Sequence, residues 1–391
     1  MLSRAVHDRP FVSKTPLAVS RFGSIKRSAL FGLIISAIIL SLLACTEEES
    51  KPAGDISVRP FSVAAVVQGS SVDEVVTALA TFIEGVDDTT RGLGSNWTVV
   101  GGARVEPGQG PEAAALKLPG SARIIEVCNH DYASQAMSMG AHHGLALPCE
   151  IAVVEDGDDV QVVLLNPEAI FGVFFADVPA EAAAGMSSLA AQVRTEIEGL
   201  VVDALAAKQA SFPNNDVGPQ WDATRLAELG AMPYAVNMDL AIPEEARADQ
   251  QSREAFATQF VETLLEVATI HGQQDVGAKV EGLSVSDWRS ARDFAPQLPG
   301  GVSLVEMCSP TYAAAALSTG AQHAPALPCV ISVWVEGDVL RVEYLDSNFI
   351  FPVFFSDAPS EMMESMGGMA AAVQQDLQLI VAEAQRRISA E

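Results

Sequence analysis

Residues 126–149 read EVCNHDYASQAMSMGAHHGLALPC, and residues 306–329 repeat this pattern as EMCSPTYAAAALSTGAQHAPALPC. The offset of 180 residues holds without a gap over 118–204 and 298–384, and about two positions in five are identical. A repeat of this length indicates an internal duplication. The sequence therefore predicts two similar domains, each large enough to bury its own hydrophobic core.

We expect the chain to have five parts arranged around this duplication. They are a signal peptide (1–44), a disordered polar tether (45–55), a first repeat domain (56–207), a linker (208–231) and a second repeat domain (232–391). The two repeats are expected to pack on each other as a pseudo-dimer.

Each repeat alternates short β-branched runs with amphipathic stretches. In the first repeat, strands are expected at 57–67, 97–105, 123–128, 149–154 and 160–165, and helices at 71–83, 131–139 and 180–207. In the second, strands are expected at 234–241, 279–286, 303–308, 329–334 and 340–345, and long helices at 252–270 and 362–388. The order β-α-β-β-(short α)-β-β-α predicts an α+β fold, an antiparallel sheet with helices packed on one face.

Local signals refine this pattern. Ser71 and Glu74 have the spacing of a capping box at a helix start, and the glycine pair at 101–102 is typical of a β-bulge. Residues 142–148 are expected to form a loop, and Asn166-Pro167 to end the preceding strand.

The N-terminal region has the pattern of an export signal. A basic segment at 21–27 precedes an apolar run at 29–43, and the run ends in LLAC at 42–45. This ending resembles the lipobox of bacterial lipoproteins, which implies cleavage before Cys45 and lipid attachment to it. Thr46 in place of Asp implies the outer membrane, facing the periplasm, in a Gram-negative host. A plain signal peptide and a signal anchor are the alternatives, and translation starting downstream of Met1 is also compatible with the long leader.

The chain is strongly acidic, with a formal net charge of −27. Such a surface repels phosphate backbones, so nucleic acid is not expected as a partner. Solubility or adaptation to salt explains the acidity without an acidic function.

The repeated motif resembles the family catalogued as domain of unknown function 302. Matching residues in the first copy are Glu126, Cys128, Asn129, Pro148, Cys149, Asn166 and Pro167; in the second they are Glu306, Cys308, Pro310, Pro328 and Cys329. The chain departs from the family at His130, Ser309 and Asp346-Ser347. The resemblance implies a fold similar to the sheet-and-helix fold of the TATA-binding protein. It implies no activity and no DNA binding.

The cysteines form two pairs, Cys128 with Cys149 and Cys308 with Cys329, each spaced by 21 residues. In an exported protein an even number favours disulfides, each stabilising by roughly 3 kcal/mol. Alternatively, each pair joins a loop histidine, His143 or His323, in a soft-metal set suited to copper or zinc. A redox-active dithiol is a third interpretation, although no Cys-x-x-Cys motif is present.

Two further residue sets are candidates. Glu126 and Glu306 lie two residues before a cysteine and share its strand face, so each is a candidate general base or a carboxylate bonded to a loop. Aromatic residues recur in both copies and are candidates to line an apolar ligand cavity or to pack in the core: Phe171, Phe174, Phe351 and Phe354.

No catalytic motif is visible, so we assign no catalytic residue. Our first hypothesis is a non-enzymatic, lipid-anchored ligand-binding or interaction module of the cell envelope. The alternative is a soft-metal-binding or thiol-redox protein that uses the cysteines and loop histidines.

Overall fold

The computed structural model describes residues 57–85, 97–100, 109–147, 149–272, 280–293, 298, 300–327 and 329–390. All of them lie in one compact unit of the chain, Asp55–Glu391. The predicted signal peptide, Cys45, the predicted tether and the glycine pair at 101–102 lie outside the described residues.

The first half of the described chain contains most of the elements that the sequence predicts. Its elements are β1 (Ser57–Val58), β2 (Phe61–Gln68), α2 (Val72–Gly85), β3 (Trp97–Val99), η3 (Pro111–Ala114), β4 (Leu116–Lys117), β5 (Arg123–Asn129), α3 (His130–Met137), η4 (Ala141–Ala146), β6 (Cys149–Asp156), β7 (Asp159–Leu165), α4 (Pro167–Phe174) and α5 (Ala180–Ala204). The capping box is confirmed, because Glu74 accepts from the Ser71 amide at 2.8 Å and the Glu74 amide donates to the Ser71 hydroxyl at 3.3 Å.

The second half follows the same order from its long helix α7 (Gln250–Gly272) onward, without a described counterpart of η3 and β4. Its elements are β8 (Ala210–Ser211), β9 (Asn215–Val217), β10 (Trp221–Asp222), α6 (Ala223–Gly230), β11 (Ala235–Asn237), β12 (Leu240–Ala241), η5 (Glu244–Ala246), α7 (Gln250–Gly272), β13 (Arg289–Asp293), β14 (Ser303–Cys308), α8 (Pro310–Leu317), η6 (Ala321–Ala326), β15 (Cys329–Glu336), β16 (Val339–Leu345), α9 (Ser347–Phe354) and α10 (Ser360–Ile388).

Two antiparallel sheets form the centre of the fold, which confirms the α+β class. The first runs β3-β5-β6-β7-β2-β8, with β4 on β5 and β9 on β2; the second runs β11-β16-β15-β14-β13, with β12 on β16. In both, a two-residue turn joins the central hairpin, and its glycine has a positive φ, +63° at Gly157 and +61° at Gly337. Glycine adopts this conformation without the strain that a side chain would impose.

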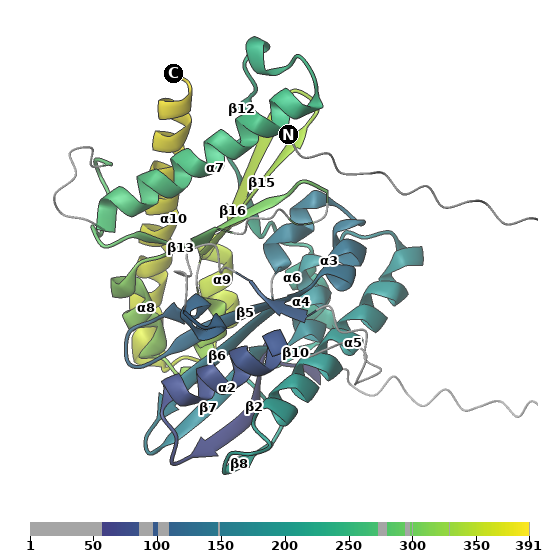
Figure 1. Cartoon of the computed structure of the whole chain (residues 1–391), viewed down its shortest axis with the longest axis vertical. Coiled ribbons are helices and arrows are strands. Elements are labelled where there is room, and N and C mark those ends of the chain that lie inside the picture. The colour runs from purple at the N-terminus through teal and green to yellow at the C-terminus, as the bar shows by residue number, and fades with distance from the viewer. Residues whose placement is uncertain are drawn as a thin grey trace, which may run out of the picture. The chain divides into compact units, whose positions relative to one another are not determined.

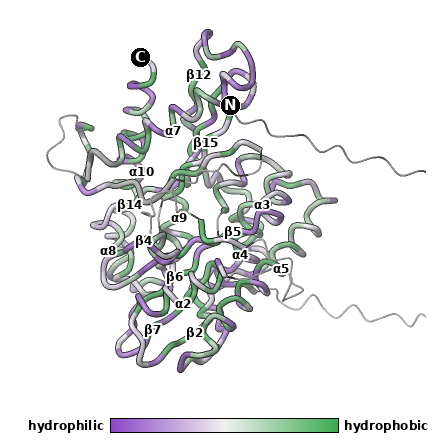
Figure 2. The backbone as a smooth tube through the Cα atoms, in the orientation of Figure 1, coloured by the Kyte–Doolittle hydropathy of each residue, from purple (hydrophilic) through white to green (hydrophobic). Residues whose placement is uncertain are grey.

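Long helices cover one face of each sheet. Helices α2 and α5 pack on the first sheet, and α7 and α10 pair with each other beside the second, where α7 contacts β13, β14 and β15 (Figure 1). Hydrophobic and hydrophilic stretches alternate along these helices (Figure 2). In α2 the buried residues follow helical spacing: Val72, Val75, Val76, Leu79, Ala80 and Ile83.

The structure differs from the sequence-based expectation at four places. The expected loop at 142–148 is largely the 3₁₀ helix η4, and the aromatic stretch after Asn166 is the helix α4, because the Asn166 side chain caps it and Pro167 occupies its first turn. The segment expected as a linker, 208–231, contains secondary structure that was not predicted: β8 and β9 pair with β2, β10 pairs with β1, and α6 follows. The strand expected at 279–286 lies later, at Arg289–Asp293.

Candidate functional site

The second face of each sheet is contacted by a short helix from the other repeat. The η6 segment of the second repeat packs on β2, β6 and β7, and the η4 segment of the first packs on β15 and β16. The fit is tight at Gly144 of η4, where an added Cβ would lie 3.2 Å from Ser332 Oγ and 3.3 Å from Val302 Cγ1. The duplicated motif therefore contributes to the packing between the two sheets.

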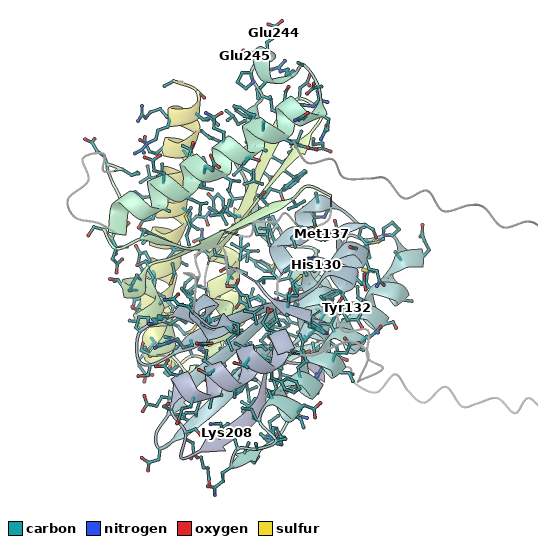
Figure 3. All side chains as sticks on the ribbon, viewed as in Figure 1. His130, Tyr132, Met137, Lys208, Glu244 and Glu245 are labelled. Carbon is teal, nitrogen blue, oxygen red and sulfur yellow. The ribbon has the colours of Figure 1, made fainter. Side chains whose placement is uncertain are left out.

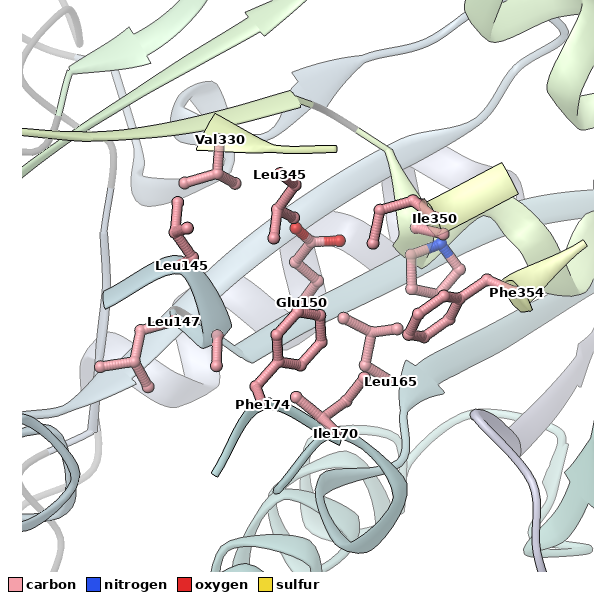
Figure 4. Close-up of a pocket in the computed structure, with 13 residues that line it drawn as sticks. Leu145, Leu147, Glu150, Leu165, Ile170, Phe174, Val330, Leu345, Ile350 and Phe354 are labelled. Atoms are coloured by element: carbon pink, nitrogen blue, oxygen red, sulfur yellow. The ribbon is translucent and has the colours of Figure 1, made fainter. Parts of the chain in front are cut away.

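A small pocket lies between the two sheets at this junction. Its volume is about 50 Å³, and a single water needs about 10–15 Å³ on this scale. Both repeats line it (Figure 4): Leu145, Ala146, Leu147, Glu150, Leu165, Ile170 and Phe174 from the first, and Pro325, Ala326, Val330, Leu345, Ile350 and Phe354 from the second. Only the Glu150 side chain is polar in this lining, so the pocket is an apolar chamber with one carboxylate in its wall.

The pocket carboxylate belongs to a buried pair of glutamates. Glu150 on β6 lies directly opposite Glu126 on β5, so the two side chains leave the sheet on the same face. Glu126 is 0% exposed and Glu150 is 7% exposed. In the second repeat, Glu306 is also 0% exposed, but its cross-strand neighbour is Val330. The pair of carboxylates is therefore a feature of the first repeat alone.

This placement bears on the predicted roles of Glu126 and Glu306. A general base must come within hydrogen-bond reach of its substrate, and both residues are fully enclosed between the sheets. The general-base interpretation thus gains no support from the site geometry. Glu150, which sequence reasoning missed, is the acidic residue that lines the pocket between the sheets.

The four described cysteines are free thiols, and the predicted disulfides are absent between them. Cys149 lies opposite Val127 and Cys329 lies opposite Met307, so each pair is one position out of register across its two strands. Because neighbouring positions of a strand point to opposite faces of the sheet, this offset does not direct the two thiols of a pair toward each other, as a disulfide requires.

The thiols are also poorly placed to ionise. Burial raises the pKa of Cys128 to about 11 and that of Cys329 to about 12. Burial also raises the pKa of Cys149, with smaller contributions from Cys128 and Glu150. Since thiolate is the reactive and metal-binding form, these environments do not activate the cysteines.

In the first repeat, the contacts of the loop histidines are with Phe174, Phe175 and Asp177 and not with the cysteines. His143 is 1% exposed, its ring stacks on Phe175 at 4.2 Å, and its Nδ1 is 3.0 Å from the Phe174 carbonyl oxygen. His142 Nε2 is 2.8 Å from Asp177 Oδ2. Among the described residues, the group of potential metal ligands that comes together is His142, His143 and Asp177, without a cysteine. The predicted Cys–Cys–His set is therefore not assembled.

Burial dominates the protonation of His143. It lowers the pKa of the imidazole to about 4, and neighbouring His142 acts in the same direction. Asp177 and the Phe174 carbonyl act in the opposite direction without overcoming the effect of burial. The His143 ring is therefore neutral at physiological pH.

His323, the counterpart in the second repeat, has two hydrogen-bond partners. Its Nε2 is 2.9 Å from Asp357 Oδ1, and its Nδ1 is 2.6 Å from Thr319 Oγ1. Burial lowers its pKa, although the hydrogen bond and charge of Asp357 oppose this shift. Asp177 and Asp357 occupy the same position of the repeat, and this shared identity was the signal that could have placed both beside the histidines.

The predicted aromatic residues are core residues in the structure. Phe171, Phe174, Phe351 and Phe354 are all at most 8% exposed. Phe174 and Phe354 also border the pocket between the sheets, and their rings stack with centroids 6.4 Å apart. Phe171 and Phe351 instead stack on Phe175 and Phe355 within their own repeats.

A buried carboxylate network recurs in both repeats and was not anticipated. Glu196 of α5 accepts from Trp97 Nε1 at 2.8 Å and from the Tyr132 hydroxyl. Tyr132 is a residue of α3 and is labelled in Figure 3. At the equivalent place in the second repeat, Asp376 of α10 accepts from Trp288 Nε1 at 2.9 Å and from the Tyr312 hydroxyl at 3.2 Å. The sequence signal for this network was an acidic residue, Glu196 or Asp376, at the same repeat position of both long helices.

The fold and junction thus define an α+β protein with two sheets that share one apolar interface. Residues 71–204 match the family model "Domain of unknown function DUF302", which covers most of the first repeat. No curated protein matches the chain.

Among solved structures, the crystal structure of DynU16, a protein in the dynemicin biosynthetic locus, matches at 11% identity with a TM-score of 0.16. The match covers 84% of this chain and 99% of that chain. A likeness at this TM-score carries no argument about fold or function.

Proposed function

We propose that this chain is a non-enzymatic binding module of the bacterial cell envelope, built from two copies of the DUF302 domain. The family match over residues 71–204 supports the first copy. The ungapped sequence repeat and the common element order from β14 to α10 support the second. The packing of η4 and η6 on the opposite sheets favours two repeats that act as one body.

The observation that carries the binding proposal is the Glu150 carboxylate in the wall of the apolar pocket. Pockets that bind small molecules are mainly apolar and contain a few polar groups that orient the ligand. A carboxylate in apolar surroundings favours a ligand with a cationic or hydrogen-bond-donating head. The small volume restricts the ligand to a short aliphatic chain, so the ligand class is a small aliphatic amine or alcohol.

This proposal predicts that n-butylamine binds the purified chain in the pocket with one molecule per chain. We expect saturation-transfer NMR signals from the butyl protons, and a tenfold to hundredfold loss of affinity in Glu150→Val, because a hydrogen bond to a charged group contributes about 1.5–3 kcal/mol. Titration calorimetry measures the affinity change.

Valine is the matched replacement because Val330 occupies the equivalent position in the second repeat. Removing one of two facing carboxylates should also leave the variant at least as stable as the parent chain, so denaturation curves separate lost binding from lost folding. Equal butylamine affinity in the parent and in Glu150→Val would rule out this pocket as the binding site.

Membrane attachment through Cys45 is the second part of the proposal. The basic segment, the apolar run and the LLAC sequence at 42–45 support it. In the part of the chain that the structure describes, no helix is both long and apolar enough to cross a bilayer.

We therefore expect Cys45→Ser to move the protein from the membrane fraction to the soluble fraction of an expressing bacterium. The reason is that serine lacks the thiol to which the lipid is attached. Cell fractionation and incorporation of labelled palmitate give the two readouts, and Cys128→Ser serves as the control. Unchanged membrane recovery of Cys45→Ser would point to a signal anchor instead.

A further inference from the structure

Three side chains of the first repeat place metal-ligating atoms around one point. His142 Nε2 is 2.8 Å from Asp177 Oδ2, and His143 Nε2 is 3.7 Å from Asp177 Oδ1. The three ligand atoms all lie within 4.8 Å of one another. In a tetrahedral zinc site with bonds of about 2.0–2.1 Å, neighbouring ligand atoms are about 3.3 Å apart. The two nitrogen–oxygen distances in the structure lie on either side of this value.

A second observation, at His143, points independently to a ligand. A carbonyl oxygen only accepts hydrogen bonds, so the contact with Phe174 places the proton on Nδ1 and leaves the lone pair on Nε2. Nε2 is buried and has no hydrogen-bond partner. A buried lone pair that faces a carboxylate oxygen is unfavourable unless a cation lies between them. A backbone carbonyl bonded to the other ring nitrogen is also the usual support of a metal-binding histidine.

The surroundings of this cluster favour a cation that enters from solvent. The side chains of Asp177 and His142 are 54% and 34% exposed, which leaves an entry path and room for a water ligand. The second repeat adds Glu343 of β16, which interacts electrostatically with His142, and Tyr234, which interacts with Asp177 and Glu343. Arg341 partly offsets the charge of Glu343, while Asp239 and Glu336 add to its negative field.

We propose that His142, His143 and Asp177 form a binding site for one zinc ion or a similar divalent transition-metal ion. Two imidazoles and one carboxylate are ligands that suit zinc, and a water molecule completes the coordination. This inference goes beyond the proposed aliphatic-ligand pocket and uses none of its lining residues. It also differs from the thiolate set expected from the sequence, because every ligand atom is nitrogen or oxygen.

The second repeat provides an internal comparison. Gln322 stands where the first repeat has His142, and its amide donates to Asp357 at 3.1 Å. His323 contacts Thr319 and Asp357 with its two ring nitrogens. The second repeat thus has one imidazole fewer, and both ring nitrogens of its remaining histidine, His323, have hydrogen-bond partners. It therefore lacks the free nitrogen lone pair that His143 has in the first repeat. The expected stoichiometry is therefore one ion per chain.

Zinc binding to the purified full chain, without an affinity tag and treated with a chelator, tests the proposal. Calorimetric titration with zinc chloride should show one saturable site per chain. Changes in outer-shell partners already lower metal affinity by about 10–100-fold, so loss of a direct ligand in His142→Gln should weaken binding by more than about 100-fold. Asp177→Asn should weaken it in the same direction.

His142→Gln copies the residue that the second repeat already has, so its fold should be unchanged by circular dichroism. Gln322→Ala is the matched control and should retain the parent affinity and one ion per chain. The proposal is overturned by parent binding weaker than about 1 mM, by two equivalent ions per chain, or by parent affinity in His142→Gln. Because butylamine binding depends on Glu150 and zinc binding on His142, each proposal can fail separately.

Discussion

Replacing Asp376 with alanine is expected to lower the free energy of unfolding by about 3–5 kcal/mol. Asp376 is 0% exposed and accepts hydrogen bonds from four donors. The donors are the Ser284 amide at 2.7 Å, the Val285 amide at 3.4 Å, Trp288 Nε1 at 2.9 Å and the Tyr312 hydroxyl at 3.2 Å. Alanine would leave these donors without their acceptor in an enclosed site, and each such group costs about 1–3 kcal/mol.

Urea denaturation followed by tryptophan fluorescence measures this loss, and Trp288 reports directly on the site. Asp376→Asn keeps one carbonyl oxygen as an acceptor, so it should lose less stability than Asp376→Ala. Glu361→Ala, at an exposed position of the same helix, should stay within about 0.5 kcal/mol of the parent chain. A stability gain in Asp376→Ala would contradict a structural role and indicate a carboxylate retained for function at a cost in stability.

The carboxylate network recurs at equivalent places in the two repeats, although its residues do not form a shared short sequence motif. Glu196 and Asp376 differ in length, yet both reach a tryptophan and a tyrosine of their own repeat. The tyrosines align at the repeat offset, but Trp97 and Trp288 do not, because the segment between the tryptophan and the ungapped part of the repeat differs in length. A comparison of the two repeats at a fixed offset therefore finds the acidic residue and the tyrosine of the network, but not the tryptophan.

Local sequence signals were sufficient for the fold class and for most elements. Periodicity and turn residues predicted the central hairpins and the long helices, because each depends on residues close in sequence. Helix α4 was missed because four of its eight residues are Ile, Phe or Val, which are weak helix formers, and tertiary burial stabilises it. The ordered segment 208–231 depends on pairing with β1 and β2, more than 140 residues earlier in the chain.

The candidate sites depend on contacts between the repeats or between distant segments, which one sequence does not specify. The histidines were predicted to join the cysteines because both lie in the same motif. In the structure, His143 instead contacts the carbonyl of Phe174, the last residue of α4, and Asp177 follows three residues later. Glu150 could be noticed only as a charge at a position where the second repeat has valine. Its place in a pocket could not be predicted, because residues of the other repeat form the opposite wall of that pocket.

Phe61→Ala is expected to lower the free energy of unfolding by about 3–5 kcal/mol, as for other fully buried phenylalanines. Phe61 on β2 is 0% exposed, and its ring lies 5.6 Å from His323 and 6.2 Å from Phe354, both in the second repeat. The substitution therefore removes contacts across the junction as well as core packing in the first sheet. Phe212→Ala, at a half-buried aromatic residue of the segment after α5, should lose less stability.

The more informative result of Phe61→Ala is which of the two sheets loses protection from amide hydrogen exchange. If the two sheets unfold as one cooperative unit, amide hydrogen exchange under mild denaturant should accelerate in β15 and β16 as much as in β2 and β7. If the repeats are independent, only the first sheet should lose protection. Since η6 packs on the first sheet and η4 on the second, each repeat supplies part of the other's buried surface. We therefore expect both sheets to lose protection together, and exchange confined to the first sheet would contradict a shared core.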